Sequence, residues 1–336
     1  MPKSKVGSSG QRSGCNGYDQ KRLERKHWIS LVNTGTEHAM KDTGFTIVGL
    51  GEVLWDVFPD GPRFGGAPAN FASTCKQLAG DRADVYVLSA VGRDALGDAA
   101  LRELFRLSVR TELVQRNERE TGQVLVELDS QGKASYRFIE YPAWDELTWT
   151  DTARTLASQT DAVCFGTLAQ RSQISRQTIE KFLDLCPEEC WKVLDLNLRF
   201  PYFTEECIVA SLKRANALKL NEDELPVVAE ILQISGSERE MLEKLQAKFG
   251  YRFVALTQGA KGSAVQTDRW TEQPANPVTI QDTVGAGDAF TAALVLGALL
   301  QQPWDSVQCW ATDVAGYVAS QSGATPALPN ELCLPQ

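Results

Sequence analysis

Short apolar runs alternate with longer segments of helical periodicity along most of the chain. The apolar runs have the length and continuity of strands buried on both faces; they are 46–50, 85–91, 161–166, 192–196 and 253–257. The longer segments repeat apolar residues every three or four positions, as in a helix that faces a core; they are 69–79, 95–107, 172–185, 204–215 and 237–249. This alternation predicts an α/β fold with a doubly wound, mainly parallel sheet flanked by helices.

Two regions interrupt the alternation. Residues 52–66 and 121–141 contain strand-like pieces with no helix between them. The second region is typical of a β-hairpin, because two segments of alternating polarity flank a turn that contains Gly132. A hairpin in this place is either an extension of the sheet edge or a flap over a site, and the pattern alone leaves both interpretations open.

Composition and charge place the chain among globular proteins with an acidic body. Of its 336 residues 43% are hydrophobic and 23% are charged, and the net charge is −9. Residues 1–44 hold eight basic and four acidic residues and are predicted to be a disordered basic leader, whereas 45–336 hold 26 and 39. The acidic body disfavours a nucleic-acid partner or an anionic membrane surface. No apolar stretch reaches the about 18 residues of a membrane span.

Histidine and cysteine usage narrows the chemistry. Both histidines, His27 and His38, lie in the leader. The body therefore cannot form a Ser-His-Asp triad, a Cys-His dyad or a His-ligated zinc site, and a base in it must be a carboxylate, Lys, Cys or Tyr. The eight cysteines are scattered, and Cys186 and Cys190, which flank a Pro-Glu-Glu turn, carry little metal-binding signal. This usage indicates a reducing, cytoplasmic location.

Segment 282–300 combines a glycine-containing loop with a helix that is apolar on every face. Such a helix is buried, and its N-terminus presents N–H groups and the positive end of the helix dipole. Gly285 and Gly287 let an anion approach this backbone closely, so the loop is a candidate anion cradle. Asp288, in the first turn, is either a simple helix cap or a base that removes a proton from a hydroxyl as a phosphoryl group arrives.

The common nucleotide-binding motifs are missing from the sequence. There is no GxxxxGK[ST] loop. Gly49 and Gly51 form a GxG after the first strand, but Leu54 stands where a dinucleotide-binding fold has its third glycine. The sequence therefore disfavours a nicotinamide-dependent dehydrogenase.

Segment 63–73 is a second candidate binding loop. Gly65 and Gly66 expose the backbone, and Asn70, early in the following helix, offers a donor and an acceptor that suit hydroxyl groups. Asp56 lies just upstream between apolar neighbours.

The two candidate loops, GGAPAN and DTVGAGDAF, resemble the two signatures of the ribokinase-like (PfkB) carbohydrate kinases. Five further elements resemble the family in the same order; they are AVGRDALG (90–97), DLNLR (195–199), NEDE (221–224), TQGAKGS (257–263) and GATPALP (323–329). The resemblance extends over 46–329, and DLNLR and the last element are similar to the fructokinase branch. It implies one ribokinase-like domain, 45–336, with a small β lid formed by the strands at 52–66 and 121–141.

The resemblance also implies roles for the matching residues. Asp288 would be the catalytic base, and the N–H groups of Gly285, Ala286 and Gly287 would form the anion hole. Arg199 would face the phosphates or the far end of the sugar. The sugar hydroxyls would be bound by four residues, Asp56, Gly65, Gly66 and Asn70.

The nucleotide and metal roles are implied in the same way. Asn221 and Glu224, whose spacing corresponds to one helical turn, would hold Mg²⁺ through water beside the ATP phosphates. Asp282 would belong to a monovalent-cation site for K⁺. Three residues would contact the nucleotide, namely Thr257, Gly259 and Gly262. Thr312 stands where many members have an Asn near the adenine, so the adenine contacts are left unassigned.

The expected activity is transfer of the γ-phosphoryl group of ATP to a sugar hydroxyl, with fructose as the first choice of sugar. The alternatives within the class are 2-keto-3-deoxygluconate kinase and ribokinase. An alternative from another class is a catalytically silent regulatory or binding relative, which the intact loop around Asp288 disfavours. The expected partners are the sugar and ATP, and a homodimer through the lid is the expected assembly.

Overall fold

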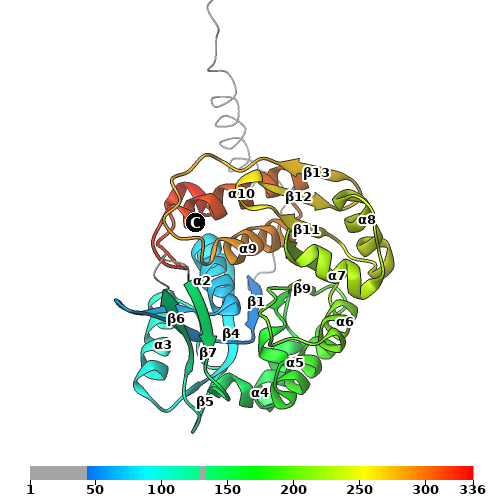
Figure 1. Ribbon diagram of the computed structural model, residues 1–336. Coiled ribbons are helices and arrows are strands. Elements are labelled where there is room, and N and C mark those ends of the chain that lie inside the picture. Colours follow the sequence, from blue (N-terminus) through cyan, green and yellow to red (C-terminus); the bar gives the residue numbers. More distant parts are fainter. Residues whose placement is uncertain (1–43, 129–133, 336) are drawn as a thin grey trace, which may run out of the picture. The chain divides into compact units, whose positions relative to one another are not determined.

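A large twisted sheet forms the centre of the fold (Figure 1). The computed structural model describes residues 44–128 and 134–335, so the predicted leader and the turn of the predicted hairpin lie outside the described residues. Within this part of the chain the sheet has nine strands in the order β13-β12-β11-β10-β9-β8-β1-β4-β5. They are β1 (Phe45–Leu50), β4 (Ala83–Gly92), β5 (Val114–Asn117), β8 (Ala162–Phe165), β9 (Trp191–Asp195), β10 (Ala217–Asn221), β11 (Val254–Thr257), β12 (Ser263–Gln266) and β13 (Trp270–Gln273).

The strand directions confirm the predicted mainly parallel sheet. All neighbours from β5 to β11 pair in parallel, and β12 and β13 add an antiparallel edge. From β1 the strand order runs to β4 and β5 on one side, and from β8 it runs to β9, β10 and β11 on the other. The order of the strands therefore reverses between β1 and β8, as in doubly wound folds.

Helices cover both faces of the sheet. On one face α2 (Ala67–Ala79) packs against β1, β4 and α9 (Ala286–Leu299), and α9 packs against α10 (Trp304–Ala319). Figure 1 shows α2 and α9 side by side near the middle of the fold. The helices of the other face are α4 (Asp151–Ala157), α5 (Gln173–Leu185), α6 (Glu205–Arg214), α7 (Glu224–Leu232) and α8 (Glu238–Phe249). The remaining helix, α3 (Ala95–Arg106), contacts β4.

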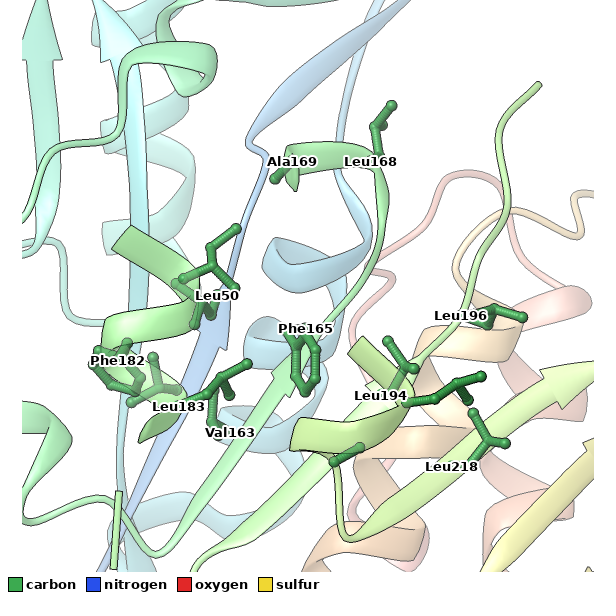
Figure 2. Close-up of a cluster of buried hydrophobic side chains, with 14 of the residues drawn as sticks. Leu50, Val163, Phe165, Leu168, Ala169, Phe182, Leu183, Leu194, Leu196 and Leu218 are labelled. Carbon is green, nitrogen blue, oxygen red and sulfur yellow. The ribbon is translucent and has the colours of Figure 1, made fainter. Parts of the chain in front are cut away.

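The second helical face encloses a continuous hydrophobic cluster (Figure 2). Leu50, Val163 and Leu194, from three adjacent strands, are fully buried there, and Phe182 of α5 packs against them. Burying a side chain of this size contributes roughly 1.5–3 kcal/mol. This cluster therefore fixes the strand ends from which the loops of the candidate site emerge.

A second, separate sheet has four strands in the order β3-β2-β6-β7. It contains the strands expected to form a lid and is called the lid below. Its strands are β2 (Leu54–Phe58), β3 (Gly61–Gly65), β6 (Gly122–Leu128) and β7 (Ala134–Phe138). β6 and β7 pair antiparallel, which confirms the predicted hairpin, and β2 pairs with β6 in parallel. Because this sheet is separate from the large one, the interpretation of the hairpin as an edge extension is wrong.

Contacts from β2 and from β7 join the lid to the main body. Trp55 Nε1 on β2 donates a hydrogen bond to Leu96 O at 3.0 Å. Phe138 on β7 packs edge-on against Tyr202, with 5.2 Å between the ring centroids. None of the described helices is long and apolar enough to cross a membrane.

Candidate active site

Asp288 lies with residues that follow β1, β8 and β9, beside the point where the strand order reverses. Ligands bind at such points in doubly wound folds. A small cavity opens there, and its lining includes Glu52, Pro68, Thr167, Asn197 and Asp288. The loops after β1 and β8 and the N-termini of α2 and α9 therefore meet in one place.

Asp288 and Asn70, from the two signature segments, are in direct contact. Asn70 Nδ2 donates a hydrogen bond to Asp288 Oδ2 at 2.9 Å, across 218 residues of sequence. Burial, together with the charge of Asp195, raises the pKa of Asp288 to about 6, although Asn70, Lys219 and Arg199 oppose the rise. At neutral pH this carboxylate is therefore mostly ionised and can accept a proton.

The loop before Asp288 is shaped by the lack of side chains. Gly285 is the N-cap of α9 with φ 80°, and a Cβ there would lie 2.4 Å from the carbonyl oxygen of Ala324. Only glycine fits this position, because the backbone is left-handed and the neighbour is itself backbone. The N–H groups at the start of α9 and its dipole can therefore meet an anion, as predicted for 285–287.

A buried charge network that sequence analysis missed lies under this loop. Lys219 Nζ on β10 pairs with Asp195 Oδ1 at 3.0 Å, and Thr291 Oγ1 donates to Asp195 Oδ2 at 2.8 Å. A Cβ on Gly287 would lie 2.9 Å from Lys219 Nζ. The ammonium group therefore lies directly against the loop 285–287, which is called the anion loop below. Burial lowers the pKa of Lys219, but the carboxylates of Asp195, Glu224 and Asp288 outweigh this and raise it.

Lys219 could have been found from its setting in the sequence. It stands inside the apolar strand ALKLN, where a charged residue is expected to be exposed. A lysine that is only 6% exposed needs an ionic partner. Glu52, which was also missed, follows the apolar strand β1 after Gly51, and burial raises its pKa to about 7.

The predicted sugar-binding residues lie on the lid and at the start of α2. Asp56 is half-buried on β2, and burial raises its pKa to about 6. Gly65 ends β3, and Gly66 is the N-cap of α2 with φ 107°. Arg199 is exposed in the loop after β9, and its charge lowers the pKa of Glu52, Asp56 and Asp288. Its positive charge therefore acts on the carboxylates of the site.

The predicted nucleotide residues lie on the neighbouring strands β10 and β11. Asn221 and Thr257 end these strands and are partners in register. Gly259 and Gly262 lie in the turn between β11 and β12, where Gln258 N donates to Gly262 O at 2.8 Å. The structure thus brings the NEDE and TQGAKGS segments together at one edge of the site.

The expectation that Asn221 and Glu224 lie on one helical turn is wrong. Asn221 is the last residue of β10, whereas Glu224 begins α7. They are linked by hydrogen bonds instead, because Glu224 Oε2 accepts from Asn221 N and Asn221 Oδ1 accepts from Glu224 N, both at 2.9 Å. Glu224 Oε1 accepts from Leu198 N at 2.9 Å. These oxygens already hold backbone N–H groups, so contact with a cation through water fits them better than direct ligation.

Asp282 joins the anion loop to the last segment of the chain. Its carboxylate accepts from Val284 N at 3.0 Å and from Gly323 N at 3.2 Å. Across 44–128 and 134–335 no three His, Cys, Asp or Glu side chains cluster as ligands for a metal ion. Cys186 and Cys190 are buried thiols and take part in no such cluster.

Comparison with known proteins agrees with this geometry. The model of the pfkB family carbohydrate kinases matches residues 60–331. A fructokinase of Klebsiella pneumoniae is 32% identical over 306 residues, which cover 83% of this chain and 95% of the relative.

Solved structures show the same fold. A fructokinase of Vibrio cholerae O395, with bound fructose, ADP and calcium ion, has a TM-score of 0.71 and 25% identity, covering 86% of this chain and 97% of that one. A fructokinase of Xylella fastidiosa with bound ATP has a TM-score of 0.74 and 21% identity, covering 85% and 96%. The sequence match and the shared architecture together show that this chain belongs to the PfkB family of carbohydrate kinases.

Proposed function

We propose that this protein is a fructokinase, which transfers the γ-phosphoryl group of ATP to a hydroxyl of fructose. The observation that carries the proposal is the contact of Asp288 with Asn70 at the N-terminus of α9. This contact supports a site in which Asp288 acts as the base, Asn70 binds a hydroxyl and the start of α9 binds an anion. Fructose is chosen because a relative at 32% identity and the structure from Vibrio cholerae are fructokinases.

The chemistry follows from these groups. Asp288 accepts the proton of the attacking hydroxyl, and Asn70 orients the carboxylate through its amide N–H. The phosphoryl group passes through a loose transition state, so catalysis depends on positioning and on stabilising negative charge. The N–H groups at the start of α9, the ammonium of Lys219 and the guanidinium of Arg199 supply that stabilisation.

Asn221 and Glu224 are the residues that would hold Mg²⁺, through water, beside the polyphosphate. The ion supplies neutralisation of phosphate charge when it is bound. We also keep three expectations as proposals. Stimulation by K⁺ at Asp282 and a homodimer through the lid follow from the family resemblance, and a cytoplasmic location follows from the cysteine usage. Chelation tests the need for Mg²⁺, and replacement of K⁺ by a larger organic cation tests stimulation by K⁺. Light scattering tests the homodimer, and cell fractionation tests the location.

A coupled assay of ADP release tests the choice of substrate. The sugars are fructose, ribose, 2-keto-3-deoxygluconate and glucose, with adenosine as a nucleoside. We expect fructose to have the highest kcat/KM. Activity with another sugar alone would replace fructose as the substrate, activity with adenosine alone would contradict a sugar kinase, and no acceptor-dependent ADP release would favour the silent relative.

Asp288→Asn tests the proposed base. Loss of a general base costs about 10²- to 10⁴-fold in rate, so we expect kcat to fall by that factor while fructose still binds, as measured by tryptophan fluorescence. Asp81→Asn makes the same change at an exposed carboxylate and serves as the control. Turnover of Asp288→Asn close to that of the control would contradict the assignment.

A further inference from the structure

Glu52 is a buried carboxylate that the proposed chemistry does not use. It follows β1 and Gly51, lines the cavity shared with Asp288, and is only 4% exposed. Glutamate is almost never this buried without an ionic partner. No ion pair to Glu52 is found within the described part of the chain, where Arg199 is the nearby cation that favours its charge. Its burial therefore needs another explanation.

A structural role explains only part of this side chain. The N–H groups of Glu52 itself and of Ala67, the first residue of α2, lie close enough to the carboxylate to lower its pKa. The N-cap of this helix, Gly66, has no side chain, so Glu52 is an acceptor available to the start of the helix. Glu52 Oε2, however, is buried and has no hydrogen-bond partner. A cap requires one carboxylate oxygen, not two.

A second acceptor without a donor lies close by. Asn70, on the first turns of the same helix, donates through Nδ2 to Asp288, but its Oδ1 is buried without a partner. A buried acceptor left without a donor destabilises the folded protein. Glu52 Oε2 belongs to a residue of the cavity lining, and Asn70 Oδ1 belongs to a side chain bonded to Asp288, which also lines the cavity. Together they indicate a place that can receive a group with several donors.

The two unpartnered acceptor oxygens fit a ligand with several hydroxyl groups. Hydroxyl groups can donate to both orphan acceptors, whereas a phosphate or carboxylate brings only further acceptors and meets the charge of Asp288. We propose that Glu52 is a specificity-determining residue, whose Oε2 binds a sugar hydroxyl other than the one that is phosphorylated. The inference rests on the proposed function, because Asp288 is assigned there to the reacting hydroxyl. A site whose polar groups bind a hydroxyl discriminates against sugars that lack it, because those polar groups are then left without a hydrogen-bond partner.

Glu52→Gln is the test variant, because it keeps the size of the side chain and one carbonyl oxygen for the N–H of Ala67. We expect KM for fructose to rise about 10- to 100-fold, the loss of one hydrogen bond to a charged group. We expect kcat to stay within about threefold and KM for ATP to be unchanged, because the change removes uniform binding. Glu118→Gln, on an exposed glutamate, is the control.

Deoxy analogues identify the contact directly. The wild-type protein should discriminate strongly against one monodeoxyfructose, and Glu52→Gln should discriminate against the same analogue much less. The melting temperature without sugar should not fall, because the helix cap is kept while a buried charge is removed. If Glu52→Gln does not fold, Glu52→Asp, which keeps the charge but withdraws it by one methylene, is measured instead with the same expectation for KM and for the analogue.

The outcomes separate the two proposals. If the wild-type protein phosphorylates fructose and the variant has a KM within twofold of it, the inference about Glu52 is overturned and the proposed function stands. The same holds if the variant loses thermal stability and its KM values for ATP and fructose rise together, since that is the result of a structural role. If the wild-type protein shows no sugar-dependent ADP release, both proposals fail.

Discussion

Lys219→Met would remove the positive charge that lies among three buried carboxylates. Its ammonium group pairs with Asp195 at 3.0 Å, and the side chains of the pair are only 8% and 5% exposed. The carboxylates of Glu224 and Asp288 also act on Lys219, because they raise its pKa. Methionine has a similar volume, so the substitution removes charge with little change in packing.

The burial of the pair determines how far this substitution lowers the free energy of unfolding. Breaking a buried ion pair by removing one partner costs about 3–5 kcal/mol, because the other charge is left without compensation. At roughly 2–4 °C per kcal/mol for a domain of this size, the melting temperature should fall by about 6–20 °C. A second substitution, Asp195→Asn, in the same chain should recover part of this loss by removing the stranded charge.

Urea unfolding followed by tryptophan fluorescence measures the loss. Lys261→Met is the matched control, since Lys261 pairs with Glu222 at 2.7 Å but is 71% exposed. An exposed pair contributes about 0–1 kcal/mol. If Lys219→Met costs no more than Lys261→Met, or if Asp195→Asn deepens the loss, the buried pair is not a stabilising unit and the reasoning fails.

Three further predictions concern pH and the anion loop. The pKa of about 6 for Asp288 predicts that kcat/KM rises through about pH 6 and is level above pH 7; a profile that is flat from pH 5 to 8 would contradict this. Glu52 binds its proton more tightly when folded, with a pKa of about 7 against 4.5, so the free energy of unfolding should fall by about 3 kcal/mol as pH rises through this window, and less in Glu52→Gln. Urea titrations at several pH values measure both slopes, and equal slopes would refute the assignment. Gly285→Ala should cost about 2–5 kcal/mol through strain and the clash with Ala324, whereas Gly323→Ala, with φ 81° and open space, should cost only the strain of about 1–2 kcal/mol; similar melting temperatures for the two variants would argue against the clash.

The large sheet was predictable because its central strands are buried on both faces and therefore read as continuous apolar runs. The strand β10 escaped prediction because Lys219 breaks its apolar run. The strands β12 (SAVQ) and β13 (WTEQ) escaped it because polar residues interrupt them. The helix α4, with seven residues, is too short for a periodic signal.

The sequence predicted which residues belong to the candidate site, but not which of them contact one another. Glycine spacing and residue type pointed to Asp288 and Asn70, but their hydrogen bond depends on α2 and α9 packing together, which no local pattern encodes. Glu52 and Lys219 were missed for one physical reason. A charged residue within or beside an apolar run suggests the end of a strand, and only the three-dimensional structure shows what surrounds it.

Glu224 connects the proposed nucleotide side and the proposed sugar side of the site. Its carboxylate holds the N–H of Asn221 on the proposed nucleotide side and the N–H of Leu198, the neighbour of Arg199, on the proposed sugar side. One side chain is thus hydrogen-bonded to both proposed substrate-binding regions and forms a joint between them. A shift of this carboxylate on arrival of the nucleotide would be transmitted through a single residue to Arg199. Sequence changes on either side of the joint are therefore expected to have effects on the two substrates that do not add independently.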